Sequence, residues 1–275
     1  MSRGRYRRLF DLQDRVAVVT GACGILGRRF AAALADHGAK VVALDLDGTD
    51  AGALASELSE GYGVDCVGLA CDIADSDAVE RALEQAVERL GDIRILVNNA
   101  AWKGDDLGDF FAPLEEFDLE TWRQVTSVNV EGQFVVAQKV GRLMLAHGKG
   151  GSIIQIASIY GVAAPDNRIY EGSDYLGHKI NTPPVYSATK AGVIGLTRHL
   201  AAHWAGSGIR ANALSPGGVR SGQNQTFLDR YGARVPLGRM AEADEMTGAL
   251  IYLASDASSY VTGQNIVVDG GLTAW

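Results

Sequence analysis

The stretch that decides the fold reads TGACGILG and occupies residues 20–27. It follows an apolar run at 16–20 and precedes a helical pattern at 28–37. Glycines here permit a tight turn and a close approach to phosphate, while free N–H groups at a helix start attract negative charge. This context predicts a dinucleotide-binding turn rather than an ordinary glycine turn followed by a surface aspartate. Its candidate binding residues are Gly21, Cys23, Gly24, Ile25, Leu26 and Gly27.

Strand-like and helix-like stretches alternate along the rest of the chain. Apolar runs predict strands at 16–20, 40–44, 64–70, 93–97, 152–157, 209–214 and 265–268. Helical periodicity marks 28–37, 51–60, 75–90, 119–146, 184–205 and 243–255. Strands that are apolar throughout are buried on both faces, and their alternation with helices requires a parallel sheet. We therefore predict an α/β fold, a doubly wound Rossmann-type parallel sheet of about seven strands with helices on both faces.

Composition fits one such domain and narrows the class of partner. The 275 residues are 47% hydrophobic and carry a net charge of −8. That charge disfavours nucleic acid and anionic membranes, and no run approaches the roughly 20 apolar residues that span a bilayer. A basic arm at 1–11, with Arg3, Arg5, Arg7 and Arg8, precedes a single catalytic domain at 12–275. We expect the arm to be a solvated leader or, alternatively, a phosphate or partner contact.

Cysteine and histidine usage bears on compartment and metal binding. The three cysteines have no paired metal spacing, and no apolar segment of signal-peptide length follows the basic arm. This pattern predicts a reduced, cytoplasmic protein. His199 and His203 lie one helical turn apart, but no cysteine pair accompanies them. We expect no metal site.

Carboxylate and amide side chains follow the next predicted strands. Asp45 lies about 20 residues beyond the glycine motif, where a carboxylate accepts hydrogen bonds from ribose hydroxyls and repels a 2′-phosphate. NAD is therefore favoured over NADP. Asp72 follows the third strand, where it can reach the adenine or cap a helix. Neighbouring candidates for the cofactor cleft are Leu46, Cys71, Ile73, Asn99, Ala100 and Ala101.

Tyr186 and Lys190 are four residues apart at the start of a predicted helix. This spacing places the phenol and the ammonium on one face. A free tyrosine has a pKa near 10, and a neighbouring cation lowers it toward the range useful for proton transfer. Ser158, at the end of the fifth strand, can donate to a substrate oxygen, and Asn129 can hold a water near Lys190.

In the order and spacing of these motifs, the sequence resembles the compact, single-domain branch of the short-chain dehydrogenase/reductase family over residues 12–272. The resemblance implies that Tyr186 is the general acid/base and that Lys190 binds the nicotinamide ribose and lowers the tyrosine pKa. It implies that Ser158 orients the substrate and that Asn129 completes a proton relay. It also places Pro216, Gly217, Val219 and Ser221 beside the nicotinamide.

The sequence departs from the family pattern in two places. The glycine spacing of residues 21–27 resembles that of the extended, sugar-nucleotide branch. Ser158 and Tyr186 are 28 positions apart, about twice the common separation, so an insertion at about 162–184 lies beside the active site. The sequence of this insertion is similar to that of short-chain dehydrogenases found with flagellin-modification and nonulosonic-acid sugar pathways.

The insertion supplies charged, amide and hydroxyl groups, which suit a polyol better than an acyl chain. It is a wall of the substrate pocket or, alternatively, a subunit contact or an exposed lid. The candidate substrate residues are Trp102, Lys103, Tyr160, Arg168, Tyr170, Glu171 and Gln223.

These features predict an NAD-dependent oxidoreductase (EC 1.1.1.-). It would transfer a hydride between nicotinamide and a secondary alcohol or ketone of a sugar, amino sugar or cyclitol, including phosphorylated or nucleotide-linked forms. The alternatives are a 3-oxoacyl thioester reductase of the same family and a non-catalytic dinucleotide-binding regulator. Apolar residues on more than one side of the helices at 119–146 and 184–205 predict a homo-oligomer. The family resemblance favours a tetramer, and a dimer is the alternative.

Overall fold

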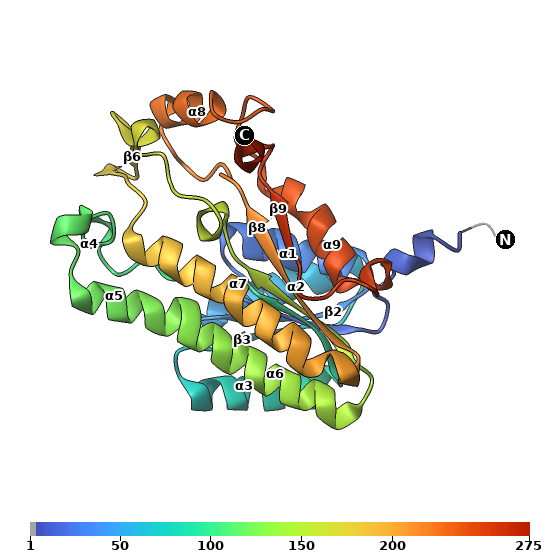
Figure 1. Ribbon diagram of the computed structural model, residues 1–275. Coiled ribbons are helices and arrows are strands. Elements are labelled where there is room, and N and C mark those ends of the chain that lie inside the picture. The colour runs from blue at the N-terminus through green and yellow to red at the C-terminus, as the bar shows by residue number, and fades with distance from the viewer. Residues whose placement is uncertain (1–3) are drawn as a thin grey trace.

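The computed structural model describes residues 4–275, and its core is one seven-stranded parallel sheet in the order β3-β2-β1-β4-β5-β8-β9 (Figure 1). The strands are β1 (Val16–Thr20), β2 (Lys40–Asp45), β3 (Cys66–Ala70), β4 (Ile93–Asn98), β5 (Gly151–Ile156), β8 (Ile209–Pro216) and β9 (Asn265–Val268). Chain order reverses between β1 and β4, so their carboxyl ends form the crevice in which such sheets bind ligands. The predicted Rossmann-type α/β fold is confirmed.

Helices cover both faces of this sheet (Figure 1). The helices within residues 4–275 are α1 (Ile25–Asp36), α2 (Gly48–Tyr62), α3 (Ser76–Leu90), α4 (Leu107–Phe110), α5 (Leu119–Thr126), α6 (Gln133–His147), α7 (Pro184–Trp204), α8 (Gln225–Gly232) and α9 (Thr247–Ala254). Apolar residues of α1, α2 and α9 pack on one face, and those of α3, α6 and α7 pack on the other. The strands between these two cores are buried on both sides, as their continuous apolar sequences predict.

The helix predicted at 119–146 contains an irregular turn. A π turn at Ser127–Gly132 joins α5 to α6, and the three segments form one continuous helical rod (Figure 1). π turns widen a helix locally and concentrate at functional sites. The predicted site residue Asn129 lies within this turn. The stretch at 243–255 also differs, because it begins as a 3₁₀ turn at Ala243–Met246.

Two segments without periodicity, 158–184 and 215–240, fold against each other. The first contains a short hairpin of β6 (Asp174–Tyr175) and β7 (His178–Lys179), and the second contains α8. A separate apolar cluster joins them, formed by Ile169, Tyr170, Ile180, Phe227, Tyr231, Val235 and Met240. We call these two segments the cap. It lies beyond the carboxyl ends of the strands (Figure 1).

The basic arm runs along the opposite side of the molecule. Arg7–Phe10 form an exposed 3₁₀ turn that contacts the turn at Asp256–Ser258, whereas Arg3 lies outside the described residues. Among the helices of residues 4–275, none combines the length and apolarity that a bilayer crossing requires.

Candidate active site

The turn between β1 and α1 depends on glycine. Gly21 has a φ of 61°, and a Cβ there would lie 2.8 Å from the Ala100 Cα. A Cβ on Gly27 would lie 2.0 Å from the Gly21 carbonyl oxygen. Both positions therefore exclude larger residues, and the turn lies tightly against β4 and its following loop.

The first turn of α1 has no side-chain cap, unlike those of its neighbours. Gly24 is its N-cap and offers no side-chain acceptor, whereas Asp47, Asp75 and Asp118 cap α2, α3 and α5 with their carboxylates. The N–H groups at the start of α1 remain available to an anion. This donor set fits the pyrophosphate of a dinucleotide.

Asp45 ends β2 at the edge of a cavity of about 400 Å³. Its two carboxylate oxygens accept hydrogen bonds from the N–H groups of Cys23 and Leu46, each at 2.8 Å. These bonds hold the carboxylate in place beside the glycine turn. Among the described residues that line this cavity, none is Lys or Arg. The other lining residues from the prediction are Gly21, Leu46, Cys71, Asp72, Ile73, Ala100 and Ala101.

Asp72 does not cap α3, because Asp75 occupies that position. Its carboxylate instead accepts a hydrogen bond from the Ala74 N–H at 2.9 Å. Of the two roles predicted for Asp72, only the one in the cofactor cleft is compatible with this geometry.

The loop after β4 is fastened to the glycine turn by Thr20. The buried Thr20 hydroxyl accepts hydrogen bonds from the N–H groups of Asn99 and Ala100, each at 3.0 Å. The Asn99 amide donates back to the Thr20 and Gly21 carbonyl oxygens. The two loops of the cleft therefore form one hydrogen-bonded unit.

Ser158, Tyr186 and Lys190 face a second cavity of about 340 Å³, which adjoins the first at Ala101 and Trp102. Lys190 is only 3% exposed, and its ammonium lies 5.8 Å from the centre of the Tyr186 ring. It donates a hydrogen bond to the Ile156 carbonyl oxygen at 2.8 Å. The predicted juxtaposition of a phenol, a hydroxyl and an ammonium is therefore present.

Burial controls the protonation of this pair. It raises the pKa of Tyr186, an effect that the Ser158 hydroxyl opposes, and it lowers the pKa of Lys190 to about 8. The expected lowering of the Tyr186 pKa by Lys190 is not found in this structure. Desolvation raises the pKa, and Lys190 does not oppose it because its ammonium bonds the backbone of β5 rather than the phenol oxygen.

Asn129 is fully buried in the π turn and does not line the cavity. Its side-chain oxygen accepts from the Trp102 N–H at 2.7 Å, and its amide donates to the Trp102 carbonyl oxygen at 3.1 Å. The side chain thus pins the loop after β4 where the two cavities meet.

The predicted residues after β8 complete the second cavity. Its lining includes Ile25, Leu26, Asn99, Pro216, Gly217, Val219 and Ser221. A Cβ on Gly217 would lie 2.7 Å from the Asp269 Cα, so this turn also requires glycine. Cys23, Gly24 and Gly27 shape the glycine turn without lining either cavity.

On the substrate side, hydroxyl groups form a chain. The Tyr160 and Tyr170 hydroxyls are 3.0 Å apart, and the Tyr170 hydroxyl also bonds the Thr182 hydroxyl. The Lys103 ammonium lies 4.9 Å from the centre of the Tyr175 ring. Tyr160, Tyr170, Lys103 and Gln223 line both the 340 Å³ cavity and an adjoining one of about 210 Å³, and Trp102 lines the former.

Arg168 and Glu171 lie elsewhere. The Arg168 guanidinium, 81% exposed, forms two hydrogen bonds with Asp166 at 2.8 Å, and Glu171 pairs with Arg230 at 3.2 Å. Neither lines a cavity with Tyr186. Their charges fasten the insertion to itself and to α8, so the structure does not bring them to the predicted substrate site.

The wall of this site also contains residues that the sequence did not single out. Thr182 and Tyr175 come from the insertion, while Phe227, Tyr231 and Met240 come from the segment around α8. Their only signal in the sequence is the lack of a clear period at 158–184 and 215–240, because long loops that follow the strands of such a sheet lie at its ligand-binding edge.

Comparison with known proteins identifies the family. The family model described as "Enoyl-(Acyl carrier protein) reductase" matches residues 21–273. A short-chain type dehydrogenase/reductase from Mycobacterium marinum has a similar crystal structure, with a TM-score of 0.85, 33% identity and 100% coverage of both chains. The chain belongs to the short-chain dehydrogenase/reductase family. It is therefore an oxidoreductase of a dinucleotide-binding family, in the compact single-domain form.

Two further members of the short-chain dehydrogenase/reductase family carry informative names. D-threitol dehydrogenase of Mycolicibacterium smegmatis is 36% identical over 96% of this chain and 95% of its own length. The gluconate 5-dehydrogenase of Burkholderia cenocepacia, crystallised with NADP and tartrate, has a TM-score of 0.86 and 36% identity. That match covers 98% of this chain and 100% of the other.

Proposed function

We propose that this protein is an NAD-dependent dehydrogenase for a secondary alcohol of a polyol, sugar or cyclitol. The observation that carries the proposal is the continuity of two cavities with different chemistry. One is lined by Asp45 and the glycine turn, and the other by Tyr186, Ser158 and the tyrosine hydroxyls. The names of the threitol and gluconate dehydrogenases support a substrate of this class.

Tyr186 is the proposed general acid/base, since its phenol faces the cavity beside Ser158. The Ser158 hydroxyl orients the reacting oxygen by a hydrogen bond. Lys190 holds the cofactor ribose and supplies positive charge behind the phenol, while Asn129 keeps Trp102 and the cleft loop in place. A bound nicotinamide would supply the hydride acceptor or donor for the carbinol carbon, and its oxidised ring would add positive charge that favours the phenolate of Tyr186.

The substrate pocket suits a molecule with several hydroxyls. The Tyr160, Tyr170 and Thr182 hydroxyls offer both donors and acceptors, and the Lys103 ammonium and Gln223 amide add polar groups. Such groups can hydrogen-bond a polyhydroxylated ligand, whereas an acyl chain would leave them without hydrogen-bond partners. Lys103 also suits substrates that carry a carboxylate or phosphate, including sugar acids and phosphorylated sugars.

A substrate panel tests this function. Purified protein with NAD⁺ is expected to produce NADH with polyols, sugar acids or cyclitols, measured by absorbance. It should reduce 3-oxoacyl thioesters far more slowly with NADH or NADPH. Fast NADPH-dependent thioester reduction would replace the proposal with the acyl reductase. Cofactor binding without turnover of either panel would favour the non-catalytic regulator.

The preference for NAD rests on Asp45. Replacing Asp45 with Asn keeps the shape but removes the charge that repels a 2′-phosphate. We expect the ratio of kcat/KM for NAD⁺ over that for NADP⁺ to fall about 100-fold, or ~3 kcal/mol. Steady-state kinetics with both cofactors measure the ratio. Asp50→Asn, an exposed change in α2, is the matched control. An unchanged ratio in Asp45→Asn would show that this carboxylate does not select the cofactor.

Assembly stays a prediction. Phe134 and Leu145 are exposed apolar residues on α6, as a helix that packs on a neighbouring subunit would have. Light scattering of the purified protein distinguishes the expected tetramer from a dimer or monomer.

A further inference from the structure

A separate cavity lies at the amino ends of the strands, whereas Tyr186 lies at their carboxyl ends. Its lining includes Arg15 just before β1, Gly151 at the start of β5 and Arg210, the second residue of β8. It encloses about 570 Å³, which exceeds either half of the candidate active site. Small-molecule sites usually measure about 300–1,000 Å³. The dehydrogenase function proposed above leaves this cavity without a role.

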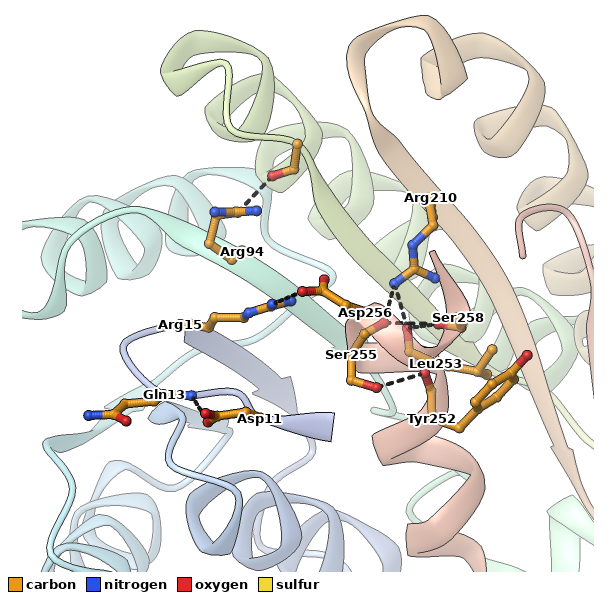
Figure 2. A network of polar contacts seen from close by, with 11 residues as sticks. Asp11, Gln13, Arg15, Arg94, Arg210, Tyr252, Leu253, Ser255, Asp256 and Ser258 are labelled. Atoms are coloured by element: carbon orange, nitrogen blue, oxygen red, sulfur yellow. Dashed lines mark hydrogen bonds and ion pairs between the residues drawn. The ribbon is translucent and has the colours of Figure 1, made fainter. Parts of the chain in front are cut away.

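Positive charge dominates this cavity. Arg15 directly precedes β1, Arg94 lies in β4 and Arg210 lies in β8. Figure 2 shows their side chains near Asp256. Asp256 is the sole acidic residue among the described lining residues. Three guanidinium groups and one carboxylate leave an excess of two positive charges in a chain whose net charge is −8.

The three arginines differ in how fully they are bonded. Arg210 donates to the carbonyl oxygens of Leu253, Ser255 and Val261, so it fastens the end of α9. Arg15 pairs with Asp256 at 2.7 Å. Arg94 donates through Nε to the Gly150 carbonyl oxygen at 2.9 Å, and its two terminal nitrogens meet no acceptor within residues 4–275.

The electrostatic environment is unfavourable for these cations as they stand. Burial lowers the pKa of Arg94 and the charge of Arg15 lowers it further, and the nearby charges of Asp256 and Asp92 offset these two effects only in part. Burial also lowers the pKa of Arg210. A half-buried guanidinium without an acidic partner costs free energy that a bound anion offsets.

We propose that this cavity binds a small phosphate-bearing molecule, with its phosphate held by Arg15 and Arg94. A phosphate group carries about −1.5 to −2 charges at pH 7, which matches the excess positive charge. The planar fork of a guanidinium pairs with two phosphate oxygens at once, and the free terminal nitrogens of Arg94 form such a fork. The volume accommodates an organic group beyond the phosphate, and the exposed Tyr260 ring lies at its rim.

The basic arm adds to this surface. Its 3₁₀ turn, Arg7–Phe10, contacts the turn that carries Asp256. The arm therefore extends the positive field around the cavity and favours the approach of an anion. This placement gives Arg7 and Arg8 a function that the dehydrogenase chemistry does not supply.

Calorimetric titration at low ionic strength tests the proposal with inorganic phosphate and phenyl phosphate, with phenol as the uncharged comparison. Both phosphates are expected to bind and phenol is not. Arg94→Gln should weaken binding at least about tenfold, whereas Arg89→Gln, an exposed arginine on α3, removes the same charge elsewhere and should leave it unchanged. Tighter binding of phenyl phosphate would indicate an organic phosphate as ligand, and equal affinities would indicate phosphate itself.

A second variant, expected to strengthen phosphate binding, distinguishes a lost binding site from a misfolded protein. Asp256→Asn removes the carboxylate that competes for Arg15, so phosphate should bind more tightly than to the unmodified protein. A damaged fold would not gain affinity. No phosphate binding, or binding that Arg94→Gln and Asp256→Asn leave unchanged, would overturn the proposal. These titrations need neither the substrate nor the cofactor, so their failure is distinct from a failure of the dehydrogenase assignment.

Discussion

Tyr186→Phe is expected to lower kcat about 10²–10⁴-fold, because it removes the one hydroxyl placed to exchange a proton with the substrate oxygen. The ring itself remains, so the cavity keeps its shape and the buried Lys190 keeps its neighbour. Cofactor binding should change little. Steady-state NADH production measures the loss, and quenching of protein fluorescence by NADH measures the retained affinity.

The matched control is Tyr62→Phe, which removes an exposed hydroxyl at the end of α2. This variant should turn over like the unmodified protein. Near-normal turnover by Tyr186→Phe would refute its assignment as the general acid/base. Parallel loss of NADH binding and turnover would instead assign the hydroxyl a role in holding the cofactor.

Lys190→Met is expected to lower kcat about 100-fold or more, because the proposed general acid/base loses its neighbouring cation, and also to change how stability depends on pH. The folded protein releases the Lys190 proton near pH 8, while the unfolded chain keeps it up to the ordinary value of 10.5. Between those pH values the unfolded state holds more protons, so a rise in pH favours the folded state. The unfolding free energy of the unmodified protein should therefore rise relative to that of Lys190→Met, by roughly 3 kcal/mol.

Urea unfolding between pH 7 and pH 10.5 measures this difference. Lys179→Met, at an exposed position in β7, provides the comparison and should show no such trend. A constant difference between the unmodified protein and Lys190→Met would mean that Lys190 keeps its proton in the folded state despite its burial. The catalytic loss and the pH trend are separate readouts of the same buried ammonium.

The sequence sufficed for the centre of the sheet because the inner strands β1, β2, β4 and β5 are buried on both faces. The run at 16–20 is buried throughout, Arg94 is the sole charged residue of the run at 93–97, and the β1–α1 turn carries glycines that no other residue could replace. The four-residue spacing of Tyr186 and Lys190 likewise needs only helical geometry. These features are local, and local patterns are what a single sequence displays.

The structure of the cap could not be predicted in this way, because contacts between segments far apart in the sequence determine it. Ile169 and Phe227 lie in short elements with little periodicity and share one small apolar cluster. The charges of Arg168 and Glu171 suggested substrate contacts, yet Asp166 and Arg230 neutralise them on the outside of the cap. Which charge meets a ligand depends on its partner in space, and sequence distance does not give that partner.

The π turn illustrates a different limit. Residues 119–146 show one continuous helical pattern, and one widened turn hardly disturbs the apolar period. The widening nevertheless places Asn129 against the Trp102 backbone. The sequence identified this residue by family resemblance, while the structure supplies the geometric role.

The cap packs largely on itself, through its own apolar cluster and the bridge between Tyr175 and Gln223. The sheet and the Tyr186–Lys190 helix have separate cores. Outside Ser158 and the turn at 216–221, substitutions can therefore accumulate in the cap while Tyr186 and Lys190 keep their own packing. A lineage can explore new substrates by remodelling this one unit, and an engineer can exchange residues 162–184 together with 222–240 between relatives while leaving Ser158 and the turn at 216–221 in place.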